Sequence, residues 1–420
     1  MKVAAYTLGC KVNQYDTNAM TELLEADGFT RVDVHEAADV YLINTCTVTN
    51  TADKKSRNMI RRLHHNNPNA IICVCGCLAQ RESADILAIE GVSAVVGTEE
   101  RGAIVKIVRE CLNGKKINCV GKIASVFEEL KVSTGGELTR GYIKIQEGCN
   151  NFCSYCIIPY VRGRVRSREE KSIITEAKML AQNDVKEIVL TGIHISSYGQ
   201  DNGASLIDML RGLNAVCGIE RIRLGSLEPH ILTVEFLHEL VQLHKICPHF
   251  HVSLQSGSDA VLMRMNRKYT TAQFAQYITN IRAVYDNPAI TTDVITGFPT
   301  ETEQEFLMSC EFVKAQRFSR IHVFPYSERE GTPAASMKNS VPQAVRRERA
   351  NRLIEIGREL EREYAEQFLH TEQTVLFEQY VNGGAEGYTE RYLRVYAEGV
   401  TGELKDVLLT EYKNNILYGK

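Results

Sequence analysis

Short apolar segments alternate with helix-like segments along most of this 420-residue chain. In the N-terminal part, three apolar segments end at Cys10, Cys46 and Cys77. Apolar strands that alternate with helices are typical of a parallel sheet with right-handed crossovers. We therefore expect an α/β domain over residues 1–115. The carboxyl ends of the strands in such a sheet meet at one edge, where ligands bind, so three distant thiols could converge there.

The middle of the chain repeats this alternation. Its strand-like segments, with helical segments between them, are 141–148, 187–193, 221–227, 249–256, 291–298 and 320–327. Their spacing suits β/α units and predicts a TIM-like barrel, or part of one, within residues 135–368. Active sites in such barrels lie in the loops that follow the strands.

The last segment, residues 369–420, reads as short strands separated by turns. Short strands of even spacing favour a small all-β barrel. Acidic residues outnumber basic residues in this segment, which argues mildly against a strong grip on a phosphate backbone.

Composition limits the compartment and the chemistry. The chain has 13 cysteines and a formal net charge of -3. An odd number of cysteines without a secretory segment argues against a disulfide framework and favours metal or redox chemistry in a reducing cytoplasm. No apolar run approaches membrane length, so we expect a cytoplasmic protein with no membrane partner. Because the net charge is small, any nucleic acid must bind through a local basic surface.

Three cysteines each close a predicted strand, and we expect Cys10, Cys46 and Cys77 to bind a metal. Cys73 and Cys75 share a strand face with Cys77, so spacing alone does not identify the third ligand. We prefer Cys77 because it ends its strand. A lone cysteine in a strand is usually a small buried apolar residue. We interpret five further cysteines in this way, as small buried apolar residues: Cys111, Cys119, Cys217, Cys247 and Cys310.

A second group of cysteines stands in the stretch EGCNNFCSYCIIP, where Cys149, Cys153 and Cys156 have the spacing CxxxCxxC. The stretch follows the first predicted barrel strand. Structural zinc sites favour paired CxxC knuckles and four ligands, whereas three thiolates can hold a four-iron cluster and leave one iron open. The apolar neighbours of the cysteines, Tyr155 among them, would limit solvent around such a cluster. A zinc knuckle or a solvated loop is the alternative.

The stretch GCNNFCSYCIIPYVRGRVRSR resembles the signature of the radical S-adenosylmethionine enzymes. Together with TLGCKVNQYD, NTCTVTNTADKK and CGCLAQ, it resembles the methylthiotransferases of that superfamily. The stretches LGCKVNQYD and NTCTVTN most resemble the MtaB-type subgroup. The resemblance covers essentially the whole chain. It implies an N-terminal cluster domain, a radical core and a C-terminal TRAM-type RNA-binding domain.

The resemblance also implies two [4Fe–4S] clusters. The CxxxCxxC cysteines match the catalytic cluster, whose open iron binds S-adenosylmethionine and whose electron yields a 5′-deoxyadenosyl radical. The three strand-end cysteines match the ligands of an auxiliary cluster, where a sulfur is carried and methylated. The radical then takes a hydrogen from an adenosine ring carbon, and the methylthio group is inserted there.

Further strand-end residues suit a place beside the cofactor. Gly297 allows close backbone approach to a ligand, and its stretch matches one that lies near the cofactor in this family. Thr191 and Gly192 in LTGIHIS, Gln255 in SLQSGSD and Gly297 in VITGFPTET end predicted strands on the same face. We name these four, together with Tyr155, as candidate cofactor neighbours. Ordinary turn chemistry explains the first four equally well.

Basic residues near both cysteine groups suggest that a phosphate backbone crosses the active face. The stretch RGRVRSR places Arg162, Arg164, Arg166 and Arg168 at alternate positions, so an extended segment would point all four the same way. We therefore name them as candidate RNA-binding residues. A second basic run, KKSRNMIRRLHH, follows Cys46. A solvated helix face is the alternative for such runs.

The resemblance implies an enzyme that methylthiolates N6-threonylcarbamoyladenosine in tRNA, beside the anticodon, to give the 2-methylthio form. Its partners would be tRNA, a flavodoxin- or ferredoxin-like electron donor and a sulfur donor. Isopentenyladenosine tRNA and a ribosomal-protein aspartate are alternative substrates. The alternative class is a non-catalytic iron–sulfur protein for RNA binding or electron transfer, which gives no reason for two open clusters and a barrel.

Overall fold

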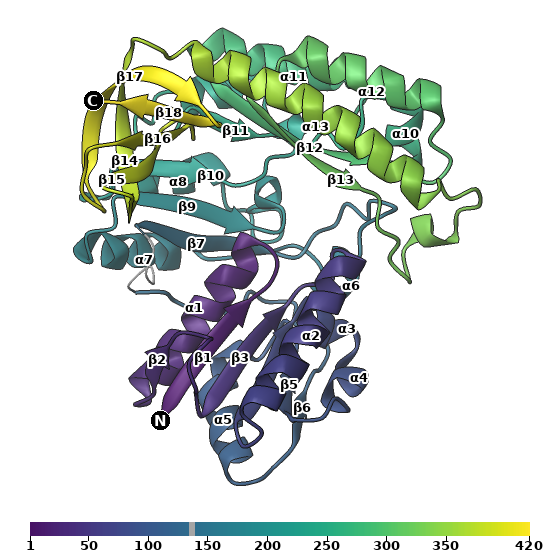
Figure 1. Ribbon diagram of the computed structural model, residues 1–420, viewed down its shortest axis with the longest axis vertical. Coiled ribbons are helices and arrows are strands. Elements are labelled where there is room, and N and C mark those ends of the chain that lie inside the picture. The colour runs from purple at the N-terminus through teal and green to yellow at the C-terminus, as the bar shows by residue number, and fades with distance from the viewer. Residues whose placement is uncertain (134–138) are drawn as a thin grey trace.

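A computed structural model describes residues 1–133 and 139–420, and its N-terminal part is a six-stranded sheet (Figure 1). The strand order is β2-β1-β3-β4-β5-β6, and every neighbouring pair is parallel. The strands are β1 (Lys2–Thr7), β2 (Thr30–Val32), β3 (Val40–Thr45), β4 (Ile71–Gly76), β5 (Val92–Val96) and β6 (Ile117–Cys119). The helices are α1 (Lys11–Ala26), α2 (Asn50–Asn66), α3 (Cys77–Arg81), α4 (Ser83–Leu87), η1 (Arg101–Ala103) and α5 (Ile104–Leu112). The predicted parallel sheet is confirmed, and β6 carries it past the predicted limit at residue 115.

Strand β4 separates its cysteines between the core and the sheet edge. Cys73 and Cys75 enter the apolar core beside α1 and α5 on one face of the sheet. Gly76 has φ +93°, and a Cβ there would lie 2.5 Å from the carbonyl oxygen of Thr45. Because glycine accepts this conformation without strain, the chain leaves the strand here. Cys77 then begins α3 instead of continuing the alternation.

The middle of the chain forms an open barrel of parallel strands. Its two sheets have the orders β10-β9-β7-β8 and β11-β12-β13, and only β8 pairs antiparallel. Isolated parallel bridges from Ile222 to Ile246 and from Leu227 to Val252 join the two sheets. The strands are β7 (Arg140–Glu147), β8 (Arg166–Ser167), β9 (Glu187–Gly192), β10 (Arg221–Leu224), β11 (His249–His251), β12 (Ala289–Thr296) and β13 (Arg320–Pro325). The predicted partial barrel is confirmed, while its predicted first residue, 135, lies outside the described residues.

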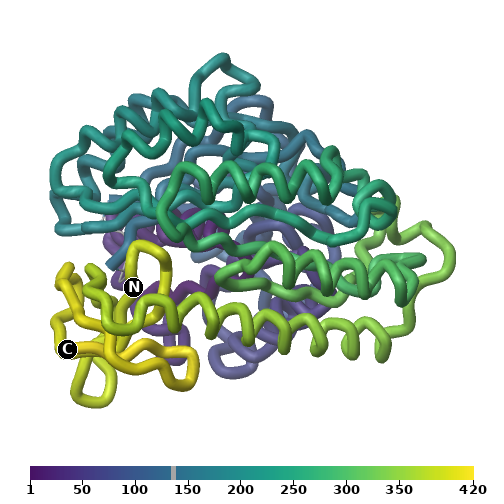
Figure 2. The backbone as a smooth tube through the Cα atoms, turned by 90° about the horizontal axis from the view of Figure 1, so that it is seen from above, coloured from purple at the N-terminus to yellow at the C-terminus, as the bar shows by residue number. Residues whose placement is uncertain are grey.

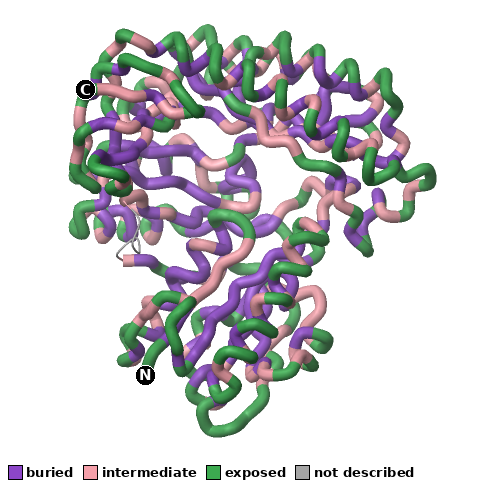
Figure 3. Tube along the Cα trace, in the orientation of Figure 1, coloured by how far each residue is buried: buried purple, intermediate pink, exposed green. Residues whose placement is uncertain are grey.

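The helices of the middle region pack against these strands in one continuous apolar core. Figure 3 shows the buried strands inside and the exposed residues on the outer helices. Longer helices have local start signals, such as the capping box that Thr302 and Glu305 form at α12. The helices are α6 (Ile158–Val161), α7 (Glu170–Gln182), η2 (Ile195–Ser197), α8 (Leu206–Asn214), η3 (Pro229–Ile231), α9 (Val234–Leu240), α10 (Asp259–Arg264), α11 (Thr271–Val284), α12 (Glu303–Gln316), η4 (Pro333–Ser336) and α13 (Gln343–Glu366).

The C-terminal segment closes into a small barrel in the order β14-β15-β16-β18-β17. Its strands are β14 (Glu372–Val381), β15 (Gly384–Thr389), β16 (Arg394–Ala397), β17 (Leu404–Lys413) and β18 (Ile416–Gly419). The long helix α13 runs along one side of the core and leads into this barrel (Figure 2). Arg223 of β10 donates to the Glu390 carbonyl oxygen at 2.7 Å, which fixes the small barrel against the core. In the described part of the chain, no helix combines the length and apolarity needed to cross a bilayer.

Candidate metal centres and the barrel cavity

The cysteines at positions 10, 46 and 77 gather at one edge of the N-terminal sheet. Cys10 precedes α1, Cys46 follows β3 and Cys77 begins α3 directly after β4. Strands β1, β3 and β4 are neighbours in the sheet, so their carboxyl ends lie side by side. A Cβ at Gly9 would lie 3.1 Å from the Cys46 sulfur, so this thiol packs directly against the Cys10 loop. The three residues we call the strand-end cysteines therefore share one site.

The thiols of this site influence one another's ionisation. Burial, together with the charges of Cys77 and Cys10, raises the pKa of Cys46 to about 12. Burial also raises the pKa of Cys77, while Arg162 opposes the shift. The thiols of Cys46 and Cys77 are buried and Cys10 is exposed beside them, a set that suits a metal, because metal binding removes the protons of thiol ligands. Cys75 instead directs its sulfur at the Ile43 carbonyl oxygen, 3.6 Å away, which favours Cys77 as the third ligand.

The CxxxCxxC cysteines lie in the loop after β7, and backbone contacts shape that loop. The Cys149 amide donates to the Gly163 carbonyl oxygen at 3.0 Å, and the Cys156 amide donates to the Cys153 carbonyl oxygen at 2.9 Å. Gly148 has φ +72°, and a Cβ there would lie 1.9 Å from the Arg164 carbonyl oxygen. The glycine before the first cysteine is therefore required for the loop to close on itself.

The donor chemistry of both groups fits an iron–sulfur cluster. Burial raises the pKa of Cys149 to about 11 and that of Cys156 to about 12, and Cys153 adds to both shifts. Among the described residues, no three His, Cys, Asp or Glu side chains are arranged around a single metal ion. Thiolates that hold a cluster bind different irons, so their sulfurs need not meet at one point.

Each cysteine group receives one guanidinium. Arg162 Nε donates to the Cys77 sulfur at 3.1 Å, and Arg267 Nη1 donates to the Cys153 sulfur at 3.2 Å. Arg267 Nη2 is held by both carboxylate oxygens of Glu228, each at 2.7 Å. Hydrogen bonds of this kind stabilise thiolates and tune a bound cluster.

The predicted role of the RGRVRSR arginines in RNA binding is wrong for three of the four. Arg162, Arg166 and Arg168 are fully buried, and Arg164 is exposed. Arg166 pairs with Glu99, and Arg168 pairs with Glu176. The segment is not one extended strand, because it begins directly after α6, turns at Gly163 and only then enters the short strand β8. Buried carboxylates, and not phosphates, therefore receive these three guanidinium groups.

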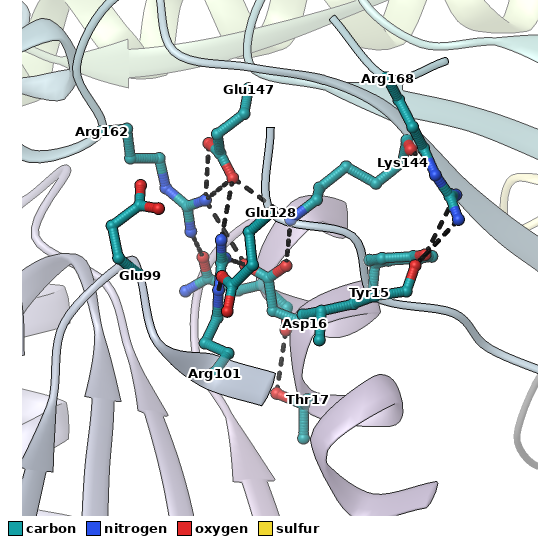
Figure 4. Close-up of polar contacts among 12 residues, drawn as sticks. Tyr15, Asp16, Thr17, Glu99, Arg101, Glu128, Lys144, Glu147, Arg162 and Arg168 are labelled. Carbon is teal, nitrogen blue, oxygen red and sulfur yellow. Dashed lines mark hydrogen bonds and ion pairs between the residues drawn. The ribbon is translucent and has the colours of Figure 1, made fainter. Parts of the chain in front are cut away.

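Arg162 is the centre of a buried ion network between the N-terminal sheet and the barrel (Figure 4). Its Nη1 lies 2.9 Å from Glu147 of β7 and 3.5 Å from Asp16 of α1. Lys144 Nζ contacts Asp16 at 2.6 Å, and Arg101 pairs with the same carboxylate. Burial alone would raise the carboxyl pKa values, but these cations hold the pKa of Asp16 below its usual range and that of Glu147 well below it.

A cavity of about 560 Å³ opens in the lumen of the barrel next to Cys10. Two candidate cofactor neighbours, Thr191 and Gly192, line it at the end of β9. The others lie elsewhere. Gln255 has φ +69° and bridges to β12, and Tyr155 packs in a separate apolar cluster.

The surroundings of Gly297 do not agree with its predicted close approach to a ligand. It has φ +67°, and a Cβ there would lie 2.4 Å from the Arg346 side chain. The glycine is therefore required by α13, which fills the space beside it.

Several cavity residues escaped the sequence reasoning. Lys11 lines the cavity immediately after Cys10, and His249, His251 and His322 line it from β11 and β13. Burial, with the charges of Arg140 and Arg223, lowers the pKa of Lys11 to about 8. The strand period of two in HFH could have signalled that its two histidines share a face. Only the barrel itself shows that this face is the lumen.

The chain matches two known protein families. Residues 2–97 match the uncharacterized protein family UPF0004, and residues 143–313 match the radical SAM superfamily. The chain is 45% identical over 409 residues to the threonylcarbamoyladenosine tRNA methylthiotransferase MtaB of Bacillus subtilis (strain 168). This match covers 94% of this chain and 90% of that protein. It is 38% identical over 403 residues to MtaB of Aquifex aeolicus (strain VF5), with 93% and 98% covered. It is also 36% identical over 431 residues to a tRNA-2-methylthio-N(6)-dimethylallyladenosine synthase of Thermoanaerobacter sp. (strain X514), with 99% and 91% covered.

Solved structures share the fold. The radical S-adenosylmethionine methyltransferase TsrM from Kitasatospora setae, with cobalamin and a [4Fe–4S] cluster bound, matches with a TM-score of 0.59 and 14% identity over 80% of this chain and 77% of that chain. The cobalamin-dependent enzyme OxsB matches with a TM-score of 0.52 and 12% identity over 87% of this chain and 56% of that chain. At these identities the likeness concerns the fold alone.

Proposed function

Because the chain belongs to the radical S-adenosylmethionine tRNA methylthiotransferases, we propose that it inserts a methylthio group into N6-threonylcarbamoyladenosine of tRNA, next to the anticodon. The product is the 2-methylthio form of that nucleoside. The two MtaB relatives carry threonylcarbamoyladenosine in their names, whereas a more distant relative is named for dimethylallyladenosine.

One observation carries this proposal: a barrel cavity large enough for a nucleoside borders Cys10, one of the strand-end cysteines, and the CxxxCxxC loop follows the first strand of the same barrel. The radical generated from S-adenosylmethionine must reach an adenosine ring carbon of the substrate. The sulfur must then be inserted at the same carbon. A single cavity beside Cys10 suits both requirements, because it would keep the base in one position for both steps.

We assign the CxxxCxxC cysteines to a [4Fe–4S] cluster with S-adenosylmethionine, and the strand-end cysteines to a second [4Fe–4S] cluster. When bound, the first cluster supplies the electron that cleaves S-adenosylmethionine, and the second carries the sulfur. The chain itself supplies ligands, positioning and exclusion of water. Glu228 fixes Arg267 against Cys153, and Glu147 fixes Arg162 against Cys77.

We place the tRNA backbone across helix α2 and not across the RGRVRSR segment. Lys54, Lys55, Arg61 and Arg62 of α2 are all exposed. This helix follows the Cys46 loop, so phosphates that contact it lie near the strand-end cysteines. An electron donor of the flavodoxin or ferredoxin class and a separate sulfur donor complete the proposed partners.

Nucleoside mass spectrometry on tRNA tests the proposal. Cells without this gene should lack 2-methylthio-N6-threonylcarbamoyladenosine and retain the unmethylthiolated nucleoside. The intact gene should restore the product, whereas a Cys149→Ala gene should not. An unchanged threonylcarbamoyl profile with a lost methylthio-isopentenyladenosine would instead assign the second substrate.

A further inference from the structure

Lys11 brings an unbalanced positive charge into the barrel cavity. Its side chain lines the lumen beside Cys10. In the described residues, no carboxylate lies within ion-pair distance of its ammonium group, and no hydrogen-bond acceptor contacts it. Lys11 is exposed to the solvent that fills the cavity, and an ammonium without a counter-ion is free to pair with an anionic group of a ligand that enters there.

The carboxylates around Lys11 already have other partners. Glu187 accepts hydrogen bonds from Arg223 at 2.7 and 3.2 Å. Asp293, the one carboxylate that lines the cavity among the described residues, lies 3.2 Å from His251 Nε2. Arg320 adds a second positive charge to the lining from β13, and its Nε lies 3.6 Å from Glu361, which stands outside the lining. The lumen therefore carries more positive than negative charge around Lys11.

A neighbouring polar atom also lacks a partner. His249 is 8% exposed and lines the cavity, and its Nδ1 is buried without a hydrogen-bond partner among the described residues. Its ring lies 5.3 Å from the Tyr392 ring, which the C-terminal barrel contributes to the same lining. Buried polar atoms in native proteins are normally satisfied, so this atom marks the place of a polar ligand.

We propose that Lys11, assisted by Arg320, binds the side-chain carboxylate of threonylcarbamoyladenosine, so that these two residues determine substrate specificity. This inference rests on the proposed function. An isopentenyl group is uncharged and would leave Lys11 unpaired in the lumen, whereas the threonylcarbamoyl group supplies the missing anion. A site built for a charged group rejects a ligand that lacks it, because the site's own charge is then left uncompensated.

S-adenosylmethionine also carries a carboxylate, and the test must separate the two sources. We assign Lys11 to the substrate because the cavity that it lines includes Cys10, where the sulfur must meet the base. The lining includes none of the CxxxCxxC cysteines.

The experiment measures equilibrium binding of anticodon stem-loop RNAs to the iron-loaded enzyme. One RNA carries threonylcarbamoyladenosine, the second carries the same group with its carboxylate converted to an amide, and the third carries isopentenyladenosine. We expect the wild-type enzyme to bind the carboxylate RNA about tenfold or more tightly than the amide RNA. Lys11→Met should abolish that preference, Arg320→Gln should reduce it, and Lys11→Arg should retain most of it.

Lys115→Met is the matched control, because Lys115 is an exposed lysine paired with Glu110 outside the cavity. It should leave the preference unchanged. Iron content is measured for every variant, since Lys11 follows a proposed ligand. If Lys11→Met loses iron, Arg320→Gln decides the question.

Three results would overturn the inference. The wild type could bind carboxylate and amide RNAs equally, or both charge-removing variants could keep the full preference. In the third case, Lys11→Met would weaken S-adenosylmethionine binding and keep the RNA preference, which would assign the lysine to the cofactor. Failure of the proposed function is distinguishable: the wild type would prefer the carboxylate RNA yet form no methylthio product in mass spectrometry.

Discussion

The two cysteine groups reach similar chemistry by opposite routes. The CxxxCxxC group comes from one loop after β7, and its shape depends on local backbone contacts. The strand-end group comes from three parts of the chain that only the sheet order β1-β3-β4 brings together. Yet each receives one buried guanidinium on a sulfur, and each guanidinium is held by a carboxylate. Local and long-range construction therefore lead to the same electrostatic arrangement.

The largest expected effect separates the two groups by reaction step. Cys149→Ala should abolish reductive formation of 5′-deoxyadenosine, because the loop cluster cannot assemble with S-adenosylmethionine. Cys46→Ala should keep that cleavage and lose the methylthiolated product. Both products are measured by mass spectrometry on anaerobically reconstituted protein. Loss of cleavage in Cys46→Ala would show that the groups do not act separately.

Stability should depend strongly on the arginine at the strand-end group. Arg162→Met should lower the free energy of unfolding by about 3–5 kcal/mol, since it leaves the buried Glu147 and Asp16 carboxylates undercompensated. Arg164→Met, in the same RGRVRSR segment, is the matched control variant. Arg164 is exposed and lies 4.4 Å from the Phe152 ring centroid, so its loss should cost about 1 kcal/mol or less. Equal losses in denaturant unfolding would contradict the burial described for Arg162.

Acid should weaken the contact between the N-terminal sheet and the barrel. The pKa values of Asp16 and Glu147 are depressed in the folded protein, so the unfolded chain binds more protons as pH falls. Their stabilisation is fully present above the unfolded carboxyl pKa of about 4 and declines below it. Unfolding measured from pH 7 downward should show this loss, and Glu147→Gln should show a shallower one. An identical pH profile in Glu147→Gln would assign the acid sensitivity to other carboxylates.

The smallest expected effect concerns the loop group. Arg267→Met removes a cationic hydrogen bond to Cys153 and should lower the cluster reduction potential, because the reduced cluster carries more negative charge. A shift on the order of 50 mV corresponds to about tenfold in the one-electron equilibrium. A redox titration followed by electron paramagnetic resonance measures it. Lys268→Met, a change at an exposed neighbour, should leave the potential in place. A potential unchanged in Arg267→Met would mean that this hydrogen bond does not tune the cluster.

The sequence predicts the cysteine positions and the sheet that carries them because strand ends and CxxxCxxC spacing are local signals. It fails for the arginine run, because the partners of Arg162 and Arg168 lie on other elements, whether 146 residues away, as Asp16 is from Arg162, or only 8, as Glu176 is from Arg168. Asp16 lies on α1, and Glu176 lies on α7. Alternation alone cannot show whether a charged side chain faces water or a buried carboxylate. The histidines of the cavity escape for a related reason, since a strand face becomes a lumen only when the barrel forms.

The contact between Arg162 and Cys77 also has a consequence for how the protein is made. Chains emerge from the ribosome with the N-terminal part first. The strand-end cysteines can gather as soon as β4 and α3 have formed, but the guanidinium that contacts Cys77 is encoded 85 residues later. Asp16 likewise lacks its ion-pair partner Lys144 until the chain has been extended by 128 residues. The buried charges of the nascent sheet therefore lack partners until the segment from β7 to Arg162 has been synthesised and has packed against the sheet. We expect cluster insertion into the strand-end site to follow that packing.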